Sequence, residues 1–138
     1  RQLAEAENRA LTLPYGPPGI GCPVISSLSG TDLAVIITEP TVSGRHDLER
    51  VFDLCRHFSI PAGVVINKYD LNRNQTDQIE AFCQDNQLSL FGRLPHDPDF
   101  THAMVQGQTV LEYDGCGAAG RHLREAWDAI RESLSVKC

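Results

Sequence analysis

The sequence predicts an α/β fold in which helices flank a parallel β-sheet in three layers. Segments with helical and strand patterns alternate from one end of the chain to the other. Two short apolar runs, 33–38 and 62–66, are rich in Val and Ile and end in polar residues, which is typical of buried parallel strands. The chain has 138 residues, no internal repeat and no linker rich in Ser, Gly and Pro. We therefore expect a single α/β domain over residues 1–138.

The first half of the chain is expected to contribute two of the strands. A charged helix over residues 1–9 precedes a short strand, Leu11–Leu13, and a short helix over 24–28 follows. The run Leu33–Thr38 shows no alternation of apolar and polar residues, which predicts a strand buried on both faces. The amphipathic helix that comes next has Ser43 as its expected N-cap. Its apolar face comprises Leu48, Val51, Phe52, Cys55 and Phe58.

The second half is expected to add two strands, over residues 62–66 and 88–94. The predicted sheet thus has four parallel strands joined by right-handed crossovers. Between the last two strands, Asn74 followed by Asp77 predicts the start of a helix. The buried face of this helix is expected to comprise Ile79, Phe82 and Cys83.

Two further helices are expected after the last strand. Asp97 is a suitable N-cap, Pro98 suits the first helical position, and Gly107 should end this helix. The final helix carries one apolar stripe, on which Trp127 is expected to be buried against the sheet. The stripe comprises Leu123, Ala126, Trp127, Ile130 and Leu134.

The loop over residues 16–23, with the sequence GPPGIGCP, is the most distinctive feature of the chain. Two prolines between glycines make a stiff, open loop whose backbone N–H groups can face an anion. The alternative is a turn with a purely structural role, because such sequences also punctuate many loops that touch no ligand. Polar residues follow the two apolar strands, Glu39 after the first and Asn67 to Asp70 after the second. Strand ends of this kind are where α/β folds bind ligands.

Four motifs, GPPGIGCP, TEPT, HDL and INKYD, occur in this order along the chain. Together they resemble the C-terminal half of the MinD/ParA/Mrp superfamily of P-loop ATPases, and especially its MinD-like members that carry a ferredoxin insert. The resemblance runs from about residue 16 to about residue 130. It implies the C-terminal half of a P-loop NTPase fold, ATP bound together with magnesium, and a dimer in which ATP bridges two subunits. It also implies a link to iron–sulfur or partitioning proteins.

The resemblance also implies which residues approach the nucleotide. In the family the loop equivalent to residues 16–22 senses the γ-phosphate and forms part of the dimer face, so it could also contact a protein partner. Gly16, Pro17 and Gly19 are the loop positions expected to contact the nucleotide. Pro95 and Asp97 follow the next strand, where family members contact the nucleoside, although for Asp97 the role of helix cap is favoured over such a contact.

The base that such a site would bind is left open by the sequence. The resemblance implies that Asn67 recognises adenine, but an Asn at this place can also just turn the chain. Asn67, Lys68 and Asp70 equally match the N-K-x-D sequence that GTPases use for guanine. In that case the Asp70 carboxylate would accept a hydrogen bond from the guanine amino group.

Two departures from the family pattern affect the expected activity. The chain contains no G-x-x-x-x-G-K-[ST] loop and no lysine-bearing deviant of it, and Tyr15 stands where the family places an aspartate for magnesium. A phenol cannot replace a carboxylate as a ligand of a hard cation. We therefore expect no ATP hydrolysis by this chain alone and assign no catalytic residue or metal ligand. The alternative is a catalytically silent α/β domain that binds a protein partner through residues 16–22.

The composition of the chain argues against several classes of partner. Eighteen acidic and twelve basic residues give a formal charge of −6 without a basic stripe, which argues against direct binding of nucleic acid. The five cysteines form no C-x-x-C pair, which favours reduced thiols in the cytoplasm and argues against an iron–sulfur cluster held by this chain alone. No secretory leader and no apolar run of bilayer-spanning length is present, so we expect no membrane association.

Self-association is expected from the strand Leu33–Thr38. In the family a P-loop strand lies beside the equivalent strand, and this chain contains no such strand. A buried-type strand without charges or prolines has no protection for its edge. It should therefore pair either with Leu11–Leu13 or with another chain, and we expect a dimer or a larger assembly.

Overall fold

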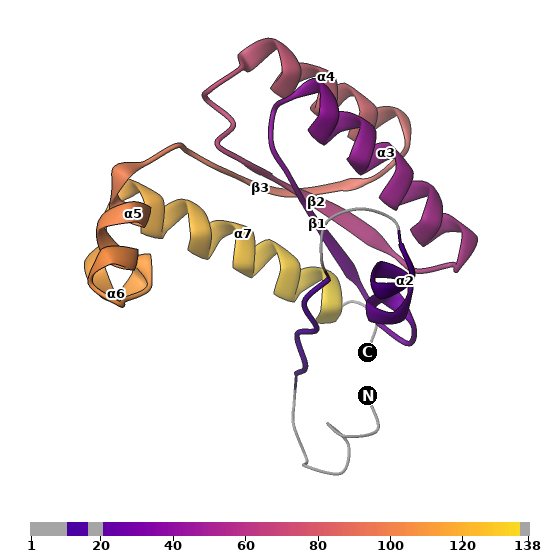
Figure 1. Cartoon of the computed structure of the whole chain (residues 1–138), viewed down its shortest axis with the longest axis horizontal. Coiled ribbons are helices and arrows are strands. Elements are labelled where there is room, and N and C mark those ends of the chain that lie inside the picture. The colour runs from indigo at the N-terminus through magenta and orange to yellow at the C-terminus, as the bar shows by residue number, and fades with distance from the viewer. Residues whose placement is uncertain (1–10, 17–20, 136–138) are drawn as a thin grey trace.

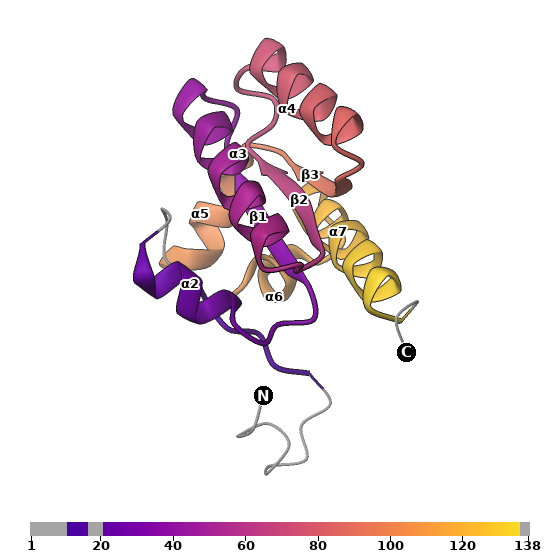
Figure 2. The ribbon, with the colours of Figure 1, turned by 90° about the vertical axis from the view of Figure 1, so that its right-hand side faces the viewer.

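The computed structural model describes residues 11–16 and 21–135. The strands are β1 (Ala34–Thr38), β2 (Ala62–Asn67) and β3 (Ser89–Leu94). The helices are α2 (Cys22–Leu28), α3 (Val42–His57), α4 (Arg73–Asp85), α5 (Pro98–Val105), α6 (Val110–Asp114) and α7 (Ala118–Ser135). The strands form one parallel sheet in the order β1-β2-β3. Helices α3 and α4 cover one face and α7 lies against the other, which confirms the predicted three-layer α/β fold (Figures 1 and 2).

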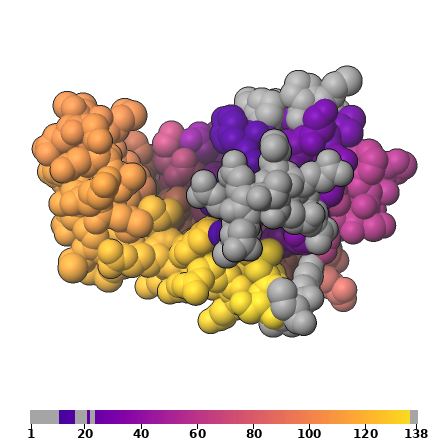
Figure 3. Space-filling model, turned by 90° about the horizontal axis from the view of Figure 1, so that it is seen from below, coloured from indigo at the N-terminus to yellow at the C-terminus, as the bar shows by residue number. Residues whose placement is uncertain are grey.

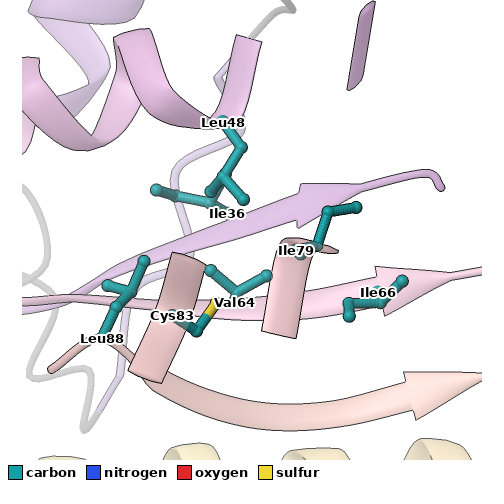
Figure 4. Packing of buried hydrophobic residues seen from close by; sticks show 7 residues of the cluster. All are labelled: Ile36, Leu48, Val64, Ile66, Ile79, Cys83 and Leu88. Atoms are coloured by element: carbon teal, nitrogen blue, oxygen red, sulfur yellow. The ribbon is translucent and has the colours of Figure 1, made fainter. Parts of the chain in front are cut away.

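The larger core cluster lies between the sheet and the helices α3 and α4 (Figure 4). Strand β2 is the centre of this core because it has a neighbour on each side, and Val64 and Ile66 are both 0% exposed. The cluster comprises Ile36, Leu48, Val64, Ile66, Ile79, Cys83 and Leu88. A smaller cluster on the opposite face joins Val65, Phe91 and Leu94 to Ala126 of α7.

Helix α7 approaches β3 closely because small residues meet at the contact. A Cβ atom on Gly92 of β3 would lie 2.7 Å from the Cβ atom of Ala126. The residues of α7 that are fully buried are the small ones, Ala119, Gly120 and Ala126. Trp127 is only partly buried, so the expectation that it is enclosed against the sheet was wrong. A close helix–sheet contact leaves no room for the indole between the two layers.

Two of the expectations for the strands were also wrong. Strand β1 alternates between buried and exposed side chains, with Ile37 66% and Val35 37% exposed, and is not buried on both faces. The physical reason is that α7 packs over β3 and β2, while β1 lies at the edge of the sheet. Leu11–Leu13 forms no strand, and Leu13 is 70% exposed. Within the described residues the sheet therefore has three strands where four were expected.

The helix starts differ slightly from those predicted. Helix α3 is capped by Thr41, whose hydroxyl accepts from the N–H of Gly44 at 2.9 Å, and not by Ser43. Helix α4 is capped by Asn72, whose side chain accepts from Gln75 N at 3.2 Å, and not by Asn74. In both cases the side chain of an earlier residue accepts from one of the free N–H groups of the first turn.

The caps around α5 were predicted correctly, and the short helix α6 was missed. Asp97 accepts from Asp99 N at 2.9 Å to start α5, and Gly107 follows that helix with φ 68°. Helix α6 begins with a capping box formed by Thr109 and Glu112. Helices α5 and α6 lie together at one end of the molecule, beside α7 (Figure 3).

No helix in the described ranges is long and apolar enough to cross a bilayer. The helix expected over residues 1–9 lies outside the described residues.

Candidate functional site

The carboxyl ends of the three strands bring the polar residues of the sequence motifs to one edge of the sheet. Because β1, β2 and β3 run parallel, Glu39, the turn Asn67 to Asp70 and the segment Pro95 to Asp97 all follow a strand at this edge. The register pairs Thr38 with Ile66 and Asn67 with Leu94, so the carboxyl ends of the three strands lie at nearly the same height along the sheet. This edge is the candidate site.

The turn after β2 has a defined backbone conformation. Lys68 has φ 54°, which lies in the left-handed region, and the N–H of Leu71 donates to Lys68 O at 3.1 Å. The hydroxyl of Thr76 on α4 donates to Tyr69 O at 2.7 Å. The Lys68 ammonium lies 2.8 Å from a carboxylate oxygen of Glu39, which joins the ends of β2 and β1. Both side chains are more than one-third exposed, so this ion pair adds little stability.

Two hydrogen bonds join the turn after β2 to the segment after β3. The N–H of Tyr69 donates to Leu94 O at 3.1 Å, and the N–H of His96 donates to Asp70 Oδ1 at 2.7 Å. The second bond is charge-assisted because its acceptor is a carboxylate. It is the main cause that lowers the pKa of Asp70, and the nearby charges of His96 and Arg73 lower it further. Asp70 is therefore ionised at neutral pH and holds the chain after β3.

Tyr69 lies between two helices at this edge. The guanidinium carbon of Arg73, on α4, lies 5.0 Å from the centre of the Tyr69 ring. The ring of His122, on α7, lies 6.5 Å away on a tilted plane. These contacts add to the hydrogen bonds that fix the conformation of the turn.

Asn67 is one of the polar side chains of this edge that are available for a ligand. It is partly buried at the end of β2, and its amide forms no hydrogen bond within the described part of the chain. An amide offers both a donor and an acceptor, which suits the edge of a purine. Asp97, by contrast, uses its side chain to cap α5. The neighbouring Pro95 is partly buried.

The residues of the loop are only partly covered by the structure. A Cβ atom at Gly16 would come within 2.9 Å of Ser27 Oγ on α2, so a glycine suits this close approach. Pro17 and Gly19 lie outside the described residues. The structure therefore brings together five of the predicted site residues at the sheet edge: Asn67, Lys68, Asp70, Pro95 and Asp97.

The polar side chains at this edge differ in whether the protein itself already pairs them. The free Asn67 amide matches a purine edge, whereas Lys68 is already paired with Glu39. No group of three or more His, Cys, Asp or Glu that could hold a metal ion occurs in the described ranges. Sequence reasoning missed the bond between Asp70 and His96, which joins residues 26 positions apart.

Comparison with known proteins identifies the class of fold. No protein-family model matches the chain. A curated relative, the uncharacterised protein MJ0578 of Methanocaldococcus jannaschii, is 27% identical over 119 residues, which cover 86% of this chain and 39% of that protein. The cell division protein MinD of Aquifex aeolicus superposes with a TM-score of 0.77 and 20% identity over 96% of this chain and 56% of that chain.

The septum site-determining protein MinD of Pyrococcus horikoshii, solved as a complex with Mg-ADP, superposes with a TM-score of 0.74 and 17% identity. This match covers 89% of this chain and 51% of that chain. The chain therefore has the fold of MinD-type P-loop ATPases, which confirms the predicted resemblance at the level of the fold. It spans about half the length of these MinD chains and 39% of MJ0578.

Proposed function

We propose that this chain is the C-terminal nucleotide-binding portion of a MinD/Mrp-like ATPase and binds the base of ATP at the carboxyl ends of β2 and β3. One observation carries the proposal: the Asn67 amide is free at the end of β2, beside a turn that contacts α4, α7 and β3. The MinD-type fold supports a domain of the nucleotide-binding kind. The proposal extends to a link with iron–sulfur or partitioning proteins and to a cytoplasmic location.

The chain's own residues would bind and orient the base without performing hydrolysis. The Asn67 amide would exchange hydrogen bonds with the purine edge, while Pro95 and Asp97 would lie along the nucleoside. When bound with magnesium, ATP supplies the phosphoryl group that such enzymes transfer. Transfer relies on positive charges and backbone donors around the phosphates, and the chain contains no lysine-bearing P-loop. Gly16, Pro17 and Gly19 would contact the phosphates only when a P-loop is also present.

We further propose that two copies of the chain associate through the edge of β1. Among the described residues no strand pairs with the outer edge of β1, and Ile37 is 66% exposed beside it. The run of β1, AVIIT, contains neither a charge nor a proline that would discourage pairing with another strand. The β1 edge of a second copy carries the same unpaired N–H and C=O groups, so the two edges can form hydrogen bonds with each other.

A second function is favoured by the residues that precede the loop. Tyr15 is 86% exposed and Leu13 is 70% exposed, and together they present an aromatic and an apolar side chain to solvent. A catalytically silent domain that binds a protein partner through this segment and residues 16–22 would use such side chains. Binding measurements on the chain distinguish the two functions.

Titration calorimetry with ATP and magnesium tests the proposed function. Asn67→Ala should weaken ATP binding by about 1–3 kcal/mol, roughly 5-fold to 150-fold, because the base loses paired hydrogen bonds. Asn74→Ala is the matched control, since that exposed amide lies on α4 and bonds to Gln78. A phosphate-release assay should detect no turnover.

Equal affinity of wild type and Asn67→Ala would leave Asn67 as a turn residue only. Turnover that persists through further purification and disappears in a Gly19→Ala variant would show that the chain hydrolyses ATP by itself. Absence of nucleotide binding by wild type would favour the protein-interaction domain.

A further inference from the structure

We propose that Thr76 of α4 is a positioning residue, whose buried hydroxyl holds the turn after β2 in the conformation that the proposed site requires. The proposal rests on the proposed function, because this turn starts directly after Asn67. The observation behind it is the hydrogen bond that the Thr76 hydroxyl donates to Tyr69 O at 2.7 Å. Thr76 acts through the backbone of the turn and does not itself touch the nucleotide.

Thr76 occupies a position on α4 where packing alone would favour an apolar residue. The buried residues of this helix are Thr76, Ile79 and Cys83, and their spacing of three and four places them on one face. Ile79 and Cys83 belong to the larger core cluster, and Thr76 is 2% exposed. A buried hydroxyl is costly unless it forms a hydrogen bond. The bond to Tyr69 O offsets that cost.

The bond from the Thr76 hydroxyl leads out of its own helix. A threonine within a helix commonly donates to the carbonyl three or four residues earlier, which here is that of Arg73 or Asn72. The Asn72 carbonyl accepts the backbone N–H of Thr76 at 3.0 Å. The hydroxyl reaches Tyr69, which lies seven positions earlier and before the N-cap of α4. The bond therefore attaches the helix to the turn.

The turn that receives this bond has a backbone conformation that other contacts must stabilise. Lys68 has φ 54°, and a residue with a Cβ atom adopts this left-handed conformation only at an energetic cost. The N–H of Leu71 donates to Lys68 O at 3.1 Å within the turn. Asp70, which accepts from His96 N, is exposed, so water competes for its carboxylate. Thr76 is buried and gives the turn a hydrogen bond that is shielded from water.

Loss of the Thr76 bond should weaken ligand binding at the end of β2. Asn67 and Lys68 are neighbours, so a change of φ at Lys68 alters the path of the chain directly after the Asn67 amide. A turn that samples several conformations has to be ordered again when a ligand binds, and this ordering lowers the affinity. Thr76 thus increases affinity by ordering the turn before the ligand arrives.

Two substitutions separate the hydroxyl of Thr76 from the shape of its side chain. Thr76→Val keeps the branched shape and loses the donor, whereas Thr76→Ser keeps the donor and loses a methyl group. In calorimetric titrations of the full chain with ATP and magnesium, Thr76→Val should bind about 5-fold more weakly or worse, and Thr76→Ser within about 2-fold of wild type. Thermal melts report whether each variant folds. Thr76→Ala also lacks the donor and takes the place of Thr76→Val if that variant is unfolded.

Amide hydrogen exchange, followed by NMR, tests the hold on the turn without any nucleotide. The amides of Tyr69 and Leu71 should exchange about 10-fold faster in Thr76→Val than in wild type, and Thr76→Ser should resemble wild type. The strong NOE between the amide and Hα protons of Lys68, a signature of positive φ, should weaken in Thr76→Val. Thr38→Val is the matched control, because Thr38 is 6% exposed and its hydroxyl donates to a carbonyl of α3. It should leave the turn unchanged.

Three results would overturn the proposal. Equal exchange of the turn amides in wild type and Thr76→Val would mean that other contacts hold the turn. Faster exchange with unchanged ATP affinity would mean that the order of the turn does not affect binding. A defect in Thr76→Ser as large as that in Thr76→Val would exclude the hydroxyl as the cause. If wild type binds no nucleotide, the proposed function fails, while the exchange data still decide whether Thr76 holds the turn.

Discussion

Two neighbouring residues of β1, Ile36 and Ile37, have opposite environments and should respond in opposite ways to lysine. Ile37 is 66% exposed, so it retains about one-third of the 1.5–3 kcal/mol that full burial of an isoleucine supplies. Ile37→Lys should therefore lower the free energy of unfolding by only about 0.5–1 kcal/mol. Ile36 is 9% exposed and faces the core cluster with Leu48 and Val64. A charge at this position costs several kcal/mol, enough to unfold a domain of ordinary stability, about 5–15 kcal/mol.

Urea melts and light scattering coupled to size exclusion measure these effects. The molar mass of wild type should rise with protein concentration, because the edge of β1 is unpaired, while Ile37→Lys should stay monomeric and folded. Val35→Lys, at a position 37% exposed, should be intermediate in stability. A wild type that remains monomeric at high concentration, with Ile37→Lys as unstable as Ile36→Lys, would refute the reasoning, because β1 would then be interior. A dimer unaffected by Ile37→Lys would place the interface elsewhere.

Two further predictions concern stability. Gly63→Ala should destabilise the protein by about 1–3 kcal/mol in urea melts, since its Cβ atom would overlap the Phe91 ring, whereas Ser89→Ala at an exposed position should change little. Burial raises the pKa of the Cys83 thiol from 9.0 to about 11, so the folded state holds this proton more tightly than the unfolded state does. The free energy of unfolding should thus fall as pH rises from about 9 to about 11, and Cys83→Ala should remove this part of the fall.

Apolar periodicity predicted the elements that have strong patterns of their own. The strands β1, β2 and β3 and the helices α3, α4 and α7 were expected because their residues repeat with strand or helix spacing. The same reasoning failed where packing against another element determines whether a strand face is buried or whether a segment forms a strand at all. An all-apolar run such as β1 has the same sequence whether or not a helix covers its second face. Among the described residues Leu11–Leu13 has no partner strand, and a run of three residues carries no sequence signal that would show this.

The residues of the candidate site were predicted from the sequence, but the hydrogen bonds between them were not. Asn67, Asp70 and Pro95 were expected at one edge because they follow parallel strands. The bond between Asp70 and His96 depends on backbone positions that only the folded sheet fixes. The capping box of α6 was different, because the T-x-x-E signal at residues 109–112 is visible in the sequence and was overlooked.

The proposed base site and the proposed association edge use different side chains. Asn67 ends β2, and the turn that follows it contacts the segment after β3 through Asp70 and the helices α4 and α7 through Tyr69. At this edge of the sheet a side-chain link to the end of β1 is the ion pair between Lys68 and Glu39, whose partners are more than one-third exposed. Exposed pairs of this kind contribute at most about 1 kcal/mol. Ile37→Lys should therefore abolish association while it changes ATP affinity by less than about 5-fold. A large loss of ATP binding in this monomeric variant would instead mean that the nucleotide lies between two subunits.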